Sequence, residues 1–216
     1  PEAAARSARY AALDAVAAET GATAVLLGHT RDDQAETVLL AMARGAGPRG
    51  LAGMAPVRGR YRRPLLGVAR AVVRQSCVDL GLEPWEDPHN FDDRYARARV
   101  RELIDTLGDK VVANLARTAA LVAMDSTELD AQAARVPVDA VLDVDELTAL
   151  APAIRTRVLR RWALRAGATP AALSYQHIVA LDALVTAWHG QGPVPLPGGI
   201  RARRVGRVIE SDPPCG

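Results

Sequence analysis

The stretch GHTRDDQAET, from Gly28 to Thr37, follows a short apolar run, AVLL at 24–27, and opens a segment whose apolar residues recur at helical spacing. We therefore expect a buried strand over 23–28 that leads into the N-terminus of a helix. One histidine and three carboxylates stand at this junction. Ligands of open α/β sheets bind beyond the carboxyl ends of the strands, so the chemistry of the protein is expected here.

The three acids have a plain structural interpretation and a chemical one. Asp32 or Asp33 is expected to cap a helix that runs to about Arg44, and Asp33 with Glu36 has the spacing of a capping box. Capping needs only one acid, whereas three are present. Carboxylates beside an arginine-lined phosphate site can hold Mg²⁺, bind an ammonium group or accept a proton from an attacking amine. Both interpretations stay open from the residues alone.

The rest of the chain predicts an α/β part followed by a helical part. A strand that is apolar on both faces belongs in a covered parallel sheet, and residues 1–104 supply too few strands for one. Either further strands precede Pro1, or the strand assignment is wrong. We predict two domains, 1–106 and 107–216, the second mostly helical with a small β-hairpin around Gly198-Gly199. The remaining expected elements are helices over 2–20, 68–80, 152–166 and 171–189, a helical region from Asp92 to about Leu150 with breaks near 108 and 136, short strands over 60–66 and 82–85, and a loop over 45–59.

Charge is distributed unevenly. Between Thr37 and Val78 there is no acid, but there are eight arginines, at positions 44, 49, 58, 60, 62, 63, 70 and 74. Such a stretch predicts a surface for phosphate or nucleic acid. Arginine-for-lysine usage (Lys110 is the only lysine) is a compositional alternative, but it does not explain the missing acids.

Two further groups of residues have the right composition for binding phosphate. The glycines of 44–54 would let backbone N–H groups approach an anion, although an ordinary loop is the simpler interpretation. Arg94, Arg97 and Arg101 share one helical face, which predicts contact with phosphate. The alternative is salt bridging to nearby acids, namely Asp92, Asp93 and Glu102.

Several side chains are expected to be structural or inert. Trp162 and Trp188 are expected in the helical core, and Met42 on the inner face of the helix that follows Asp33. The isolated Cys77 and Cys215 argue against a local zinc or iron–sulfur site and fit a reducing cytoplasm. The sequence has no run of membrane-spanning length and no visible signal peptide.

Several motifs together resemble one family. They are Glu2 to Tyr10 (EAAARSARY), His29-x-x-Asp32-Asp33-x-x-Glu36-Thr37, Arg44-Gly45-x-Gly47-x-x-Gly50-Leu51-x-Gly53-Met54, Arg63-Pro64-Leu65-Leu66, and Trp85-x-Asp87-x-x-Asn90 through Arg97-x-Arg99-Val100-Arg101. In this order they resemble tRNA(Ile)-lysidine synthetases, which are PP-loop ATP pyrophosphatases. The resemblance is dense over about 2–101 and looser beyond, where Leu196-Pro197-Gly198-Gly199 is similar to a family feature.

The resemblance implies an α/β PP-loop catalytic domain and an ATP-dependent ligase. The enzyme would adenylate the C2 carbonyl oxygen of the wobble cytidine in a CAU-anticodon tRNA(Ile), and L-lysine would then displace AMP to give lysidine. It implies ATP and Mg²⁺ as cofactors, tRNA(Ile), L-lysine and ATP as partners, a cytoplasmic location and no membrane. A homodimer of the chain is left open. The implied site residues are His29, Asp33 and Glu36 for catalysis, Arg9, His29 and Asp32 for ATP, Asp32 and Asp33 for Mg²⁺, and Arg44, Arg49, Arg63, Arg97, Arg99 and Arg101 for the substrate tRNA.

The chain departs from the family pattern in three places. The SGGxDS phosphate loop is absent and is expected before Pro1, and a polypeptide without it is not expected to bind ATP productively. The proline that usually follows Arg101 closely is missing, and Ala98 stands where many members have Asn. Two other functions stay open: a basic tRNA-binding module without catalysis, and a PP-loop enzyme with another nucleophile, as in tRNA thiolation. The scarcity of cysteine disfavours the latter.

Overall fold

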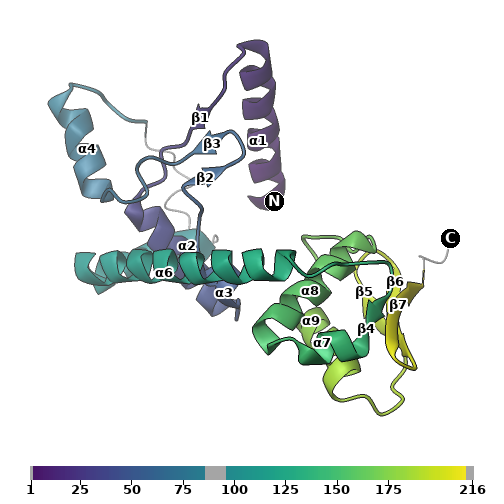
Figure 1. Cartoon of the computed structure of the whole chain (residues 1–216). Coiled ribbons are helices and arrows are strands. Elements are labelled where there is room, and N and C mark those ends of the chain that lie inside the picture. The colour runs from purple at the N-terminus through teal and green to yellow at the C-terminus, as the bar shows by residue number, and fades with distance from the viewer. Residues whose placement is uncertain (1, 86–95, 213–216) are drawn as a thin grey trace. The chain divides into compact units, whose positions relative to one another are not determined.

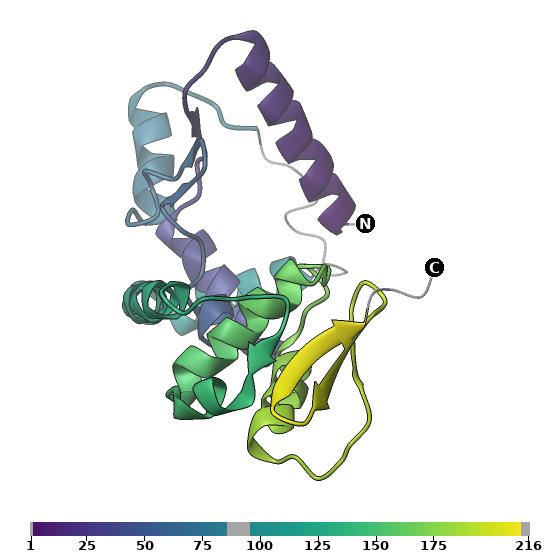
Figure 2. The ribbon, with the colours of Figure 1, turned by 45° about the vertical axis from the view of Figure 1, so that its right-hand side comes forward.

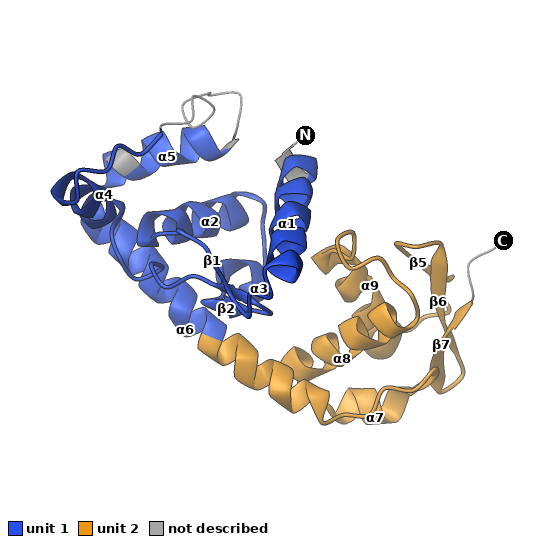
Figure 3. Cartoon of the chain, turned by 90° about the horizontal axis from the view of Figure 1, so that it is seen from above, with its two compact units in different colours: residues 1–123 blue, residues 124–216 orange. Residues whose placement is uncertain are grey.

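The computed structural model describes residues 2–85 and 96–212. The chain forms two compact units, residues 1–123 and 124–216, and the boundary falls inside helix α6 (Asp109–Ala134) (Figure 3). The first unit joins helices to a sheet with a parallel strand pair, and the second is helical with strands near its C-terminal end. The fold class is therefore the expected one, while a domain division at 106/107 stays a prediction. No helix in the described residues combines the length and the apolar character that a membrane crossing requires.

The helices of the first unit lie close to the expected positions. They are α1 (Glu2–Glu19), α2 (Arg31–Ala43), α3 (Pro48–Leu51), α4 (Arg70–Asp79) and α5 (Ala96–Leu107), followed by α6 (Figure 1). The expected loop over 45–59 is wrong in part, because it contains α3, which begins at a proline as short helices often do. The expected strand over 82–85 does not form, since these residues enter no ladder.

The sheet of the first unit is small. Its strands are β1 (Val25–Leu26), β2 (Val57–Arg58) and β3 (Tyr61–Arg62), in the order β1-β3-β2. β1 is parallel to β3, as predicted, and β2 is antiparallel to β3. The strand expected over 23–28 is wrong in length and burial. Leu26 is 71% exposed, because β1 is a two-residue edge strand in the sheet that the described residues form.

A small apolar cluster holds α2 against α5 and α6. Ala35, Ile104 and Val112 are buried together, with Leu39, Val100 and Leu115 packed around them. Met42 was expected on this inner face, but it is exposed and Ala41 is buried instead. The cluster brings the start of α5 beside the first turns of α2, although some 60 residues separate them in sequence.

The second unit contains the rest of α6, β4 (Leu142–Asp143), α7 (Val144–Ala149), α8 (Pro152–Arg165), α9 (Tyr175–Thr186), β5 (Val194–Leu196), β6 (Ile200–Val205) and β7 (Val208–Asp212). Its sheet is antiparallel, in the order β4-β7-β6-β5 (Figure 2). The expected hairpin around Gly198-Gly199 joins β5 to β6. Trp162 is in the core as expected, but Trp188 is 37% exposed, and the guanidinium of Arg204 lies over its ring at 5.6 Å.

Candidate active site

Helix α2 begins with a capping box formed by Thr30 and Asp33. Thr30 is the N-cap, and its Oγ1 accepts from the backbone N–H of Asp33 at 3.4 Å. Asp33 Oδ2 accepts in return from the backbone N–H of Thr30 at 2.7 Å and from its hydroxyl at 2.8 Å. The cap was predicted at Asp32 or Asp33, but it is Thr30, and the capping box pairs Thr30 with Asp33 rather than Asp33 with Glu36. A threonine in extended conformation places its hydroxyl over the free N–H groups of the first turn.

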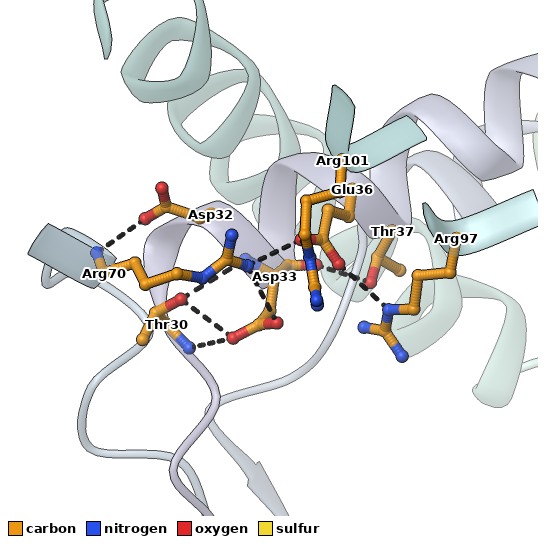
Figure 4. A network of polar contacts seen from close by, with 8 residues as sticks. All are labelled: Thr30, Asp32, Asp33, Glu36, Thr37, Arg70, Arg97 and Arg101. Atoms are coloured by element: carbon orange, nitrogen blue, oxygen red, sulfur yellow. Dashed lines mark hydrogen bonds and ion pairs between the residues drawn. The ribbon is translucent and has the colours of Figure 1, made fainter. Parts of the chain in front are cut away.

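The side chain of Asp32 binds the N-terminal end of a different helix, α4. Its Oδ2 accepts from the backbone N–H of Arg70 at 2.8 Å, at the first residue of α4 (Figure 4). The N-cap position of α4 is Ala69, whose side chain cannot accept a hydrogen bond. A carboxylate from α2 thus satisfies a donor that α4 cannot satisfy locally.

Glu36 lies at the centre of an arginine cluster. It is fully buried, and three guanidinium groups surround its carboxylate (Figure 4). Arg70 Nη2 donates to Oε1 at 2.6 Å, Arg101 Nε donates to Oε1 at 2.9 Å, and Arg97 Nε donates to Oε2 at 3.0 Å. The three arginines come from α4 and α5, and each is itself partly buried. Glu36 therefore compensates positive charge that α4 and α5 bring to one place.

This arrangement bears on two predictions about the roles of these residues, which themselves stay predictions. Glu36, expected to be catalytic, has no exposed surface, and its oxygens are taken by arginines, so a substrate cannot reach it in this structure. The face of Arg97 and Arg101 was expected to need phosphate for compensation, with local acids as the alternative. Its counter-ion is Glu36, which neither interpretation named. Arg94, Asp92 and Asp93 lie outside the described residues.

The acids are held in their ionised forms. Burial alone would raise the pKa of Asp33, but hydrogen bonds from the Thr30 backbone and hydroxyl and the charge of Arg70 outweigh it, and the pKa lies below its usual value. Burial of Glu36 is likewise outweighed by hydrogen bonds from Arg101 and Arg70, which lower its pKa. Both carboxylates therefore carry negative charge, and Asp33, with an 18% exposed side chain, is the accessible one.

His29 has a lowered pKa and an unused ring nitrogen. Burial lowers its pKa, and the charges of Arg63, Arg97 and Arg9 act in the same direction, against the opposing charge of Asp33. Its Nδ1 is buried and has no hydrogen-bond partner in the described structure. An unpaired buried polar atom is costly, and a ligand that bonds to it would recover that cost.

Arg63 does not lie where a tRNA phosphate could reach it. It is 4% exposed, and its terminal nitrogens donate to Ala55 O at 2.7 Å and to the Tyr10 hydroxyl at 3.2 Å. The Tyr10 ring packs edge-on against Tyr61 at 4.8 Å. The assignment of Arg63 to tRNA contact stays a prediction, and its burial in this structure does not favour it. The buried guanidinium of Arg63 links Tyr10 of α1 to Ala55, which follows α3.

The glycine-rich loop is held by an amide side chain. Gln34 donates to Met54 O at 3.1 Å and accepts from Met54 N–H at 2.7 Å. Gly53 has φ +65°, and a Cβ there would lie 2.8 Å from the Gln34 amide group. A Cβ on Gly50 would meet the Ala46 methyl group at 2.5 Å. Packing therefore explains why glycine stands at both positions, which favours the structural interpretation of this loop.

The other predicted contact residues lie at the surface of the first unit. Arg9 on α1, Arg44 at the end of α2, Arg49 on α3 and Arg99 on α5 are all exposed. Asp32 and Asp33 do not form a magnesium site by themselves. The described residues contain no group of three or more histidine, cysteine or acidic side chains suited to a metal ion, and hydrogen bonds engage Asp33 Oδ2 and Asp32 Oδ2. The donor set therefore does not fit a protein-held Mg²⁺.

Sequence reasoning missed Thr30 and Arg70 as site residues. Thr30 carried a signal, since a threonine three residues before an acid at a helix start is typical of a capping box. Arg70 carried none beyond its place in the acid-free stretch, because its partners are 34 and 37 positions away in sequence.

Known proteins resemble the chain over both units. A PP-loop domain model matches residues 1–107, and a TilS substrate binding domain model matches residues 142–208. The tRNA(Ile)-lysidine synthase of Salinispora tropica is 58% identical over 99% of this chain and 68% of its own length. The protein of that name from Streptomyces coelicolor is 54% identical, covering 95% of this chain and 62% of its own, and the one from Mycobacterium bovis is 47% identical, covering 94% and 65%.

Proposed function

We propose, from the premise that this chain belongs to the tRNA(Ile)-lysidine synthase family, that its reaction joins L-lysine to C2 of the wobble cytidine in CAU-anticodon tRNA(Ile) at the expense of ATP. The observation that carries the proposal is the cluster at the start of α2. There an accessible carboxylate, Asp33, lies within 3.4 Å of a guanidinium that also binds Glu36. Such a cluster offers Asp33 as an anionic group for an amine, beside Arg97 and Arg101 as cationic groups for phosphate.

In the first step the C2 oxygen of cytidine attacks the α-phosphorus of ATP. An O–P bond forms, the bond from that phosphorus to pyrophosphate breaks, and pyrophosphate leaves. Charge accumulates on the phosphoryl oxygens, and positively charged donors stabilise it. Arg97 and Arg101 bind Glu36 through Nε, so their terminal nitrogens face no acceptor among the described residues and are suited to this task. The unpaired Nδ1 of His29 and the exposed Arg9 are the proposed contacts to the nucleotide.

In the second step the lysine amine attacks C2. A C–N bond forms, the C2–O bond breaks, and AMP leaves with that oxygen. The nitrogen gains positive charge as it bonds to C2, so an ionised carboxylate can accept its proton although its own pKa is low. Asp33 is the proposed acceptor, because it is ionised and partly exposed. Glu36 then holds the arginines in place and does not touch substrate.

Magnesium is expected to accompany ATP. Mg²⁺ keeps several waters and is commonly bound through substrate phosphates and one or two carboxylates. Since the described residues do not gather a ligand set of their own, we propose that the ion arrives with the nucleotide. No step above depends on Asp32 or Asp33 as its ligand.

Transfer of labelled lysine tests the proposal. The complete gene product, with any segment encoded outside residues 1–216, is incubated with ATP, labelled lysine and CAU-anticodon tRNA(Ile). We expect label on the tRNA and release of AMP and pyrophosphate, neither of which should occur without ATP. Binding of tRNA without transfer would overturn the ligase assignment in favour of a binding module, and a sulfur-dependent mass shift would favour thiolation. Sedimentation of the same protein tests the homodimer, and cell fractionation tests a cytoplasmic location.

A further inference from the structure

One guanidinium nitrogen of Arg70 contacts both acids of the cluster. Its Nη2 lies 2.6 Å from Glu36 Oε1 and 3.4 Å from Asp33 Oδ1 (Figure 4). Arg97 and Arg101 each contact Glu36 through Nε. Among the residues that the structure describes, Arg70 is therefore the cation that links the buried acid to the accessible one.

The backbone of Arg70 is fixed by the same turn of α2. Asp32 Oδ2 accepts from its N–H at 2.8 Å, and α4 begins at this residue. The side chain leaves α4 toward Glu36 and is 25% exposed, similar to the 18% of Asp33. Both ends of Arg70 are thus bound by acids of the first two turns of α2, which restricts its rotamers.

The contacts of Asp33 differ between its two oxygens. Oδ2 is held by the backbone and hydroxyl of Thr30, and this contact belongs to the helix cap. Oδ1 has Arg70 as its partner in the described part of the chain. The direction in which Asp33 presents its free oxygen therefore depends on Arg70, and an amine nucleophile is sensitive to small errors in the direction of approach.

We propose that Arg70 is a positioning residue for the lysine step, which holds Asp33 Oδ1 relative to Glu36 so that the carboxylate meets the incoming amine in one geometry. This inference rests on the proposed function. It assigns no contact between Arg70 and ATP, lysine or tRNA, so the affinity for ATP is not expected to depend on Arg70.

The test compares Arg70→Gln and Arg70→Lys in the complete gene product. A lysine keeps one positive charge but cannot present the planar guanidinium that Arg70 uses. We expect Arg70→Gln to raise the KM for lysine or lower the rate of lysine transfer by at least about tenfold, with Arg70→Lys between it and the wild type. The KM for ATP should stay within about twofold of the wild-type value. Arg117→Gln is the matched control, because Arg117 is exposed on α6 and donates to Asn114 of the same helix.

The outcomes separate this inference from the proposed function. If the wild-type protein transfers no lysine, the proposed function fails. If the wild-type protein transfers lysine but both Arg70 variants keep its KM and rate for lysine, the positioning role is overturned. It is also overturned if the variants change the kinetic constants for ATP and for lysine by the same factor. Circular dichroism and thermal unfolding accompany each variant. Should Arg70→Gln not fold, Arg70→Lys decides, and failure of both to fold would mean that Arg70 serves only the structure.

Discussion

Glu36 Oε1 accepts a hydrogen bond from Arg101 Nε at 2.9 Å, although the two residues stand 65 positions apart in the chain. The contact places a fully buried carboxylate against an arginine of α5. It explains how an arginine-rich helix can pack against the rest of the first unit, because the buried carboxylate compensates part of its charge. The stability of the unit should therefore depend on the charge at position 36.

Neutralising Glu36 is expected to destabilise the protein strongly. Glu36→Gln would leave the partly buried guanidiniums of Arg70, Arg97 and Arg101 without their common counter-ion. Breaking a buried ion pair on one side costs about 3–5 kcal/mol. Urea-induced unfolding of both proteins measures the difference.

A surface pair provides the comparison for Glu36. Arg203 contacts Glu210 and Asp212 on the C-terminal sheet, and its side chain is 46% exposed. Arg203→Gln should change the unfolding free energy by no more than about 1 kcal/mol. Equal losses in the two variants would contradict the role given to Glu36.

Acid should destabilise the first unit in two stages. Below pH 6.5, the ordinary pKa of histidine, the unfolded chain binds a proton at His29 more readily than the folded one, whose His29 pKa is lowered. Below pH 4.5, the ordinary value for glutamate, stability that is present above it is lost as the pH falls toward the lowered pKa of Glu36. Unfolding free energies measured from about pH 7 to pH 3 test both stages.

A single variant shows which residue causes which stage of the acid destabilisation. His29→Gln should remove the stage that begins at pH 6.5 and leave the one below 4.5. A wild-type profile that stays flat down to pH 4.5 would contradict the lowered pKa of His29.

Gly53 should not tolerate alanine. Its φ of +65° is unfavourable for a residue with a Cβ, and that Cβ would lie 2.8 Å from the Gln34 side chain. We expect Gly53→Ala to lower the unfolding free energy by about 1–3 kcal/mol. Gly67→Ala is the control, because nothing lies within 4 Å of its added Cβ and its φ is not in the left-handed region. If thermal unfolding shows the two variants to be alike, the packing reason for Gly53 is wrong.

Binding of tRNA is expected to weaken steeply with salt. Exposed arginines at 44, 49 and 99 give the first unit sites for phosphate contact, and each neutralised phosphate contributes about 0.7–0.9 to the slope of log K against log salt concentration. Arg44→Gln and Arg99→Gln should each reduce that slope by about one if the residue contacts phosphate. Arg117→Gln should leave it unchanged, and a flat profile for the wild type would contradict a basic tRNA-binding surface.

The sequence was most informative where the reasons are local. Apolar periodicity placed α1, α4 and α8 to within about two residues, because one buried face at helical spacing is visible in a short window. It also located the cluster at the start of α2, since a helix beginning after a strand leaves a recognisable pattern. The predicted strand lengths and the predicted burial of Met42 and Trp188 were wrong. Burial depends on neighbours in space, which apolar periodicity in the sequence does not identify.

By itself the sequence determined the fold class, the family resemblance and the place where acids and basic residues gather. Only the tertiary structure decided which of them meet. It placed Glu36 out of reach beneath three arginines, gave Asp32 to the start of α4, buried Arg63 and joined Arg70 to Asp33. The reason is physical: a charge is stabilised by whichever opposite charge packs within a few ångströms, and packing between helices brings together residues at separations that no local pattern encodes.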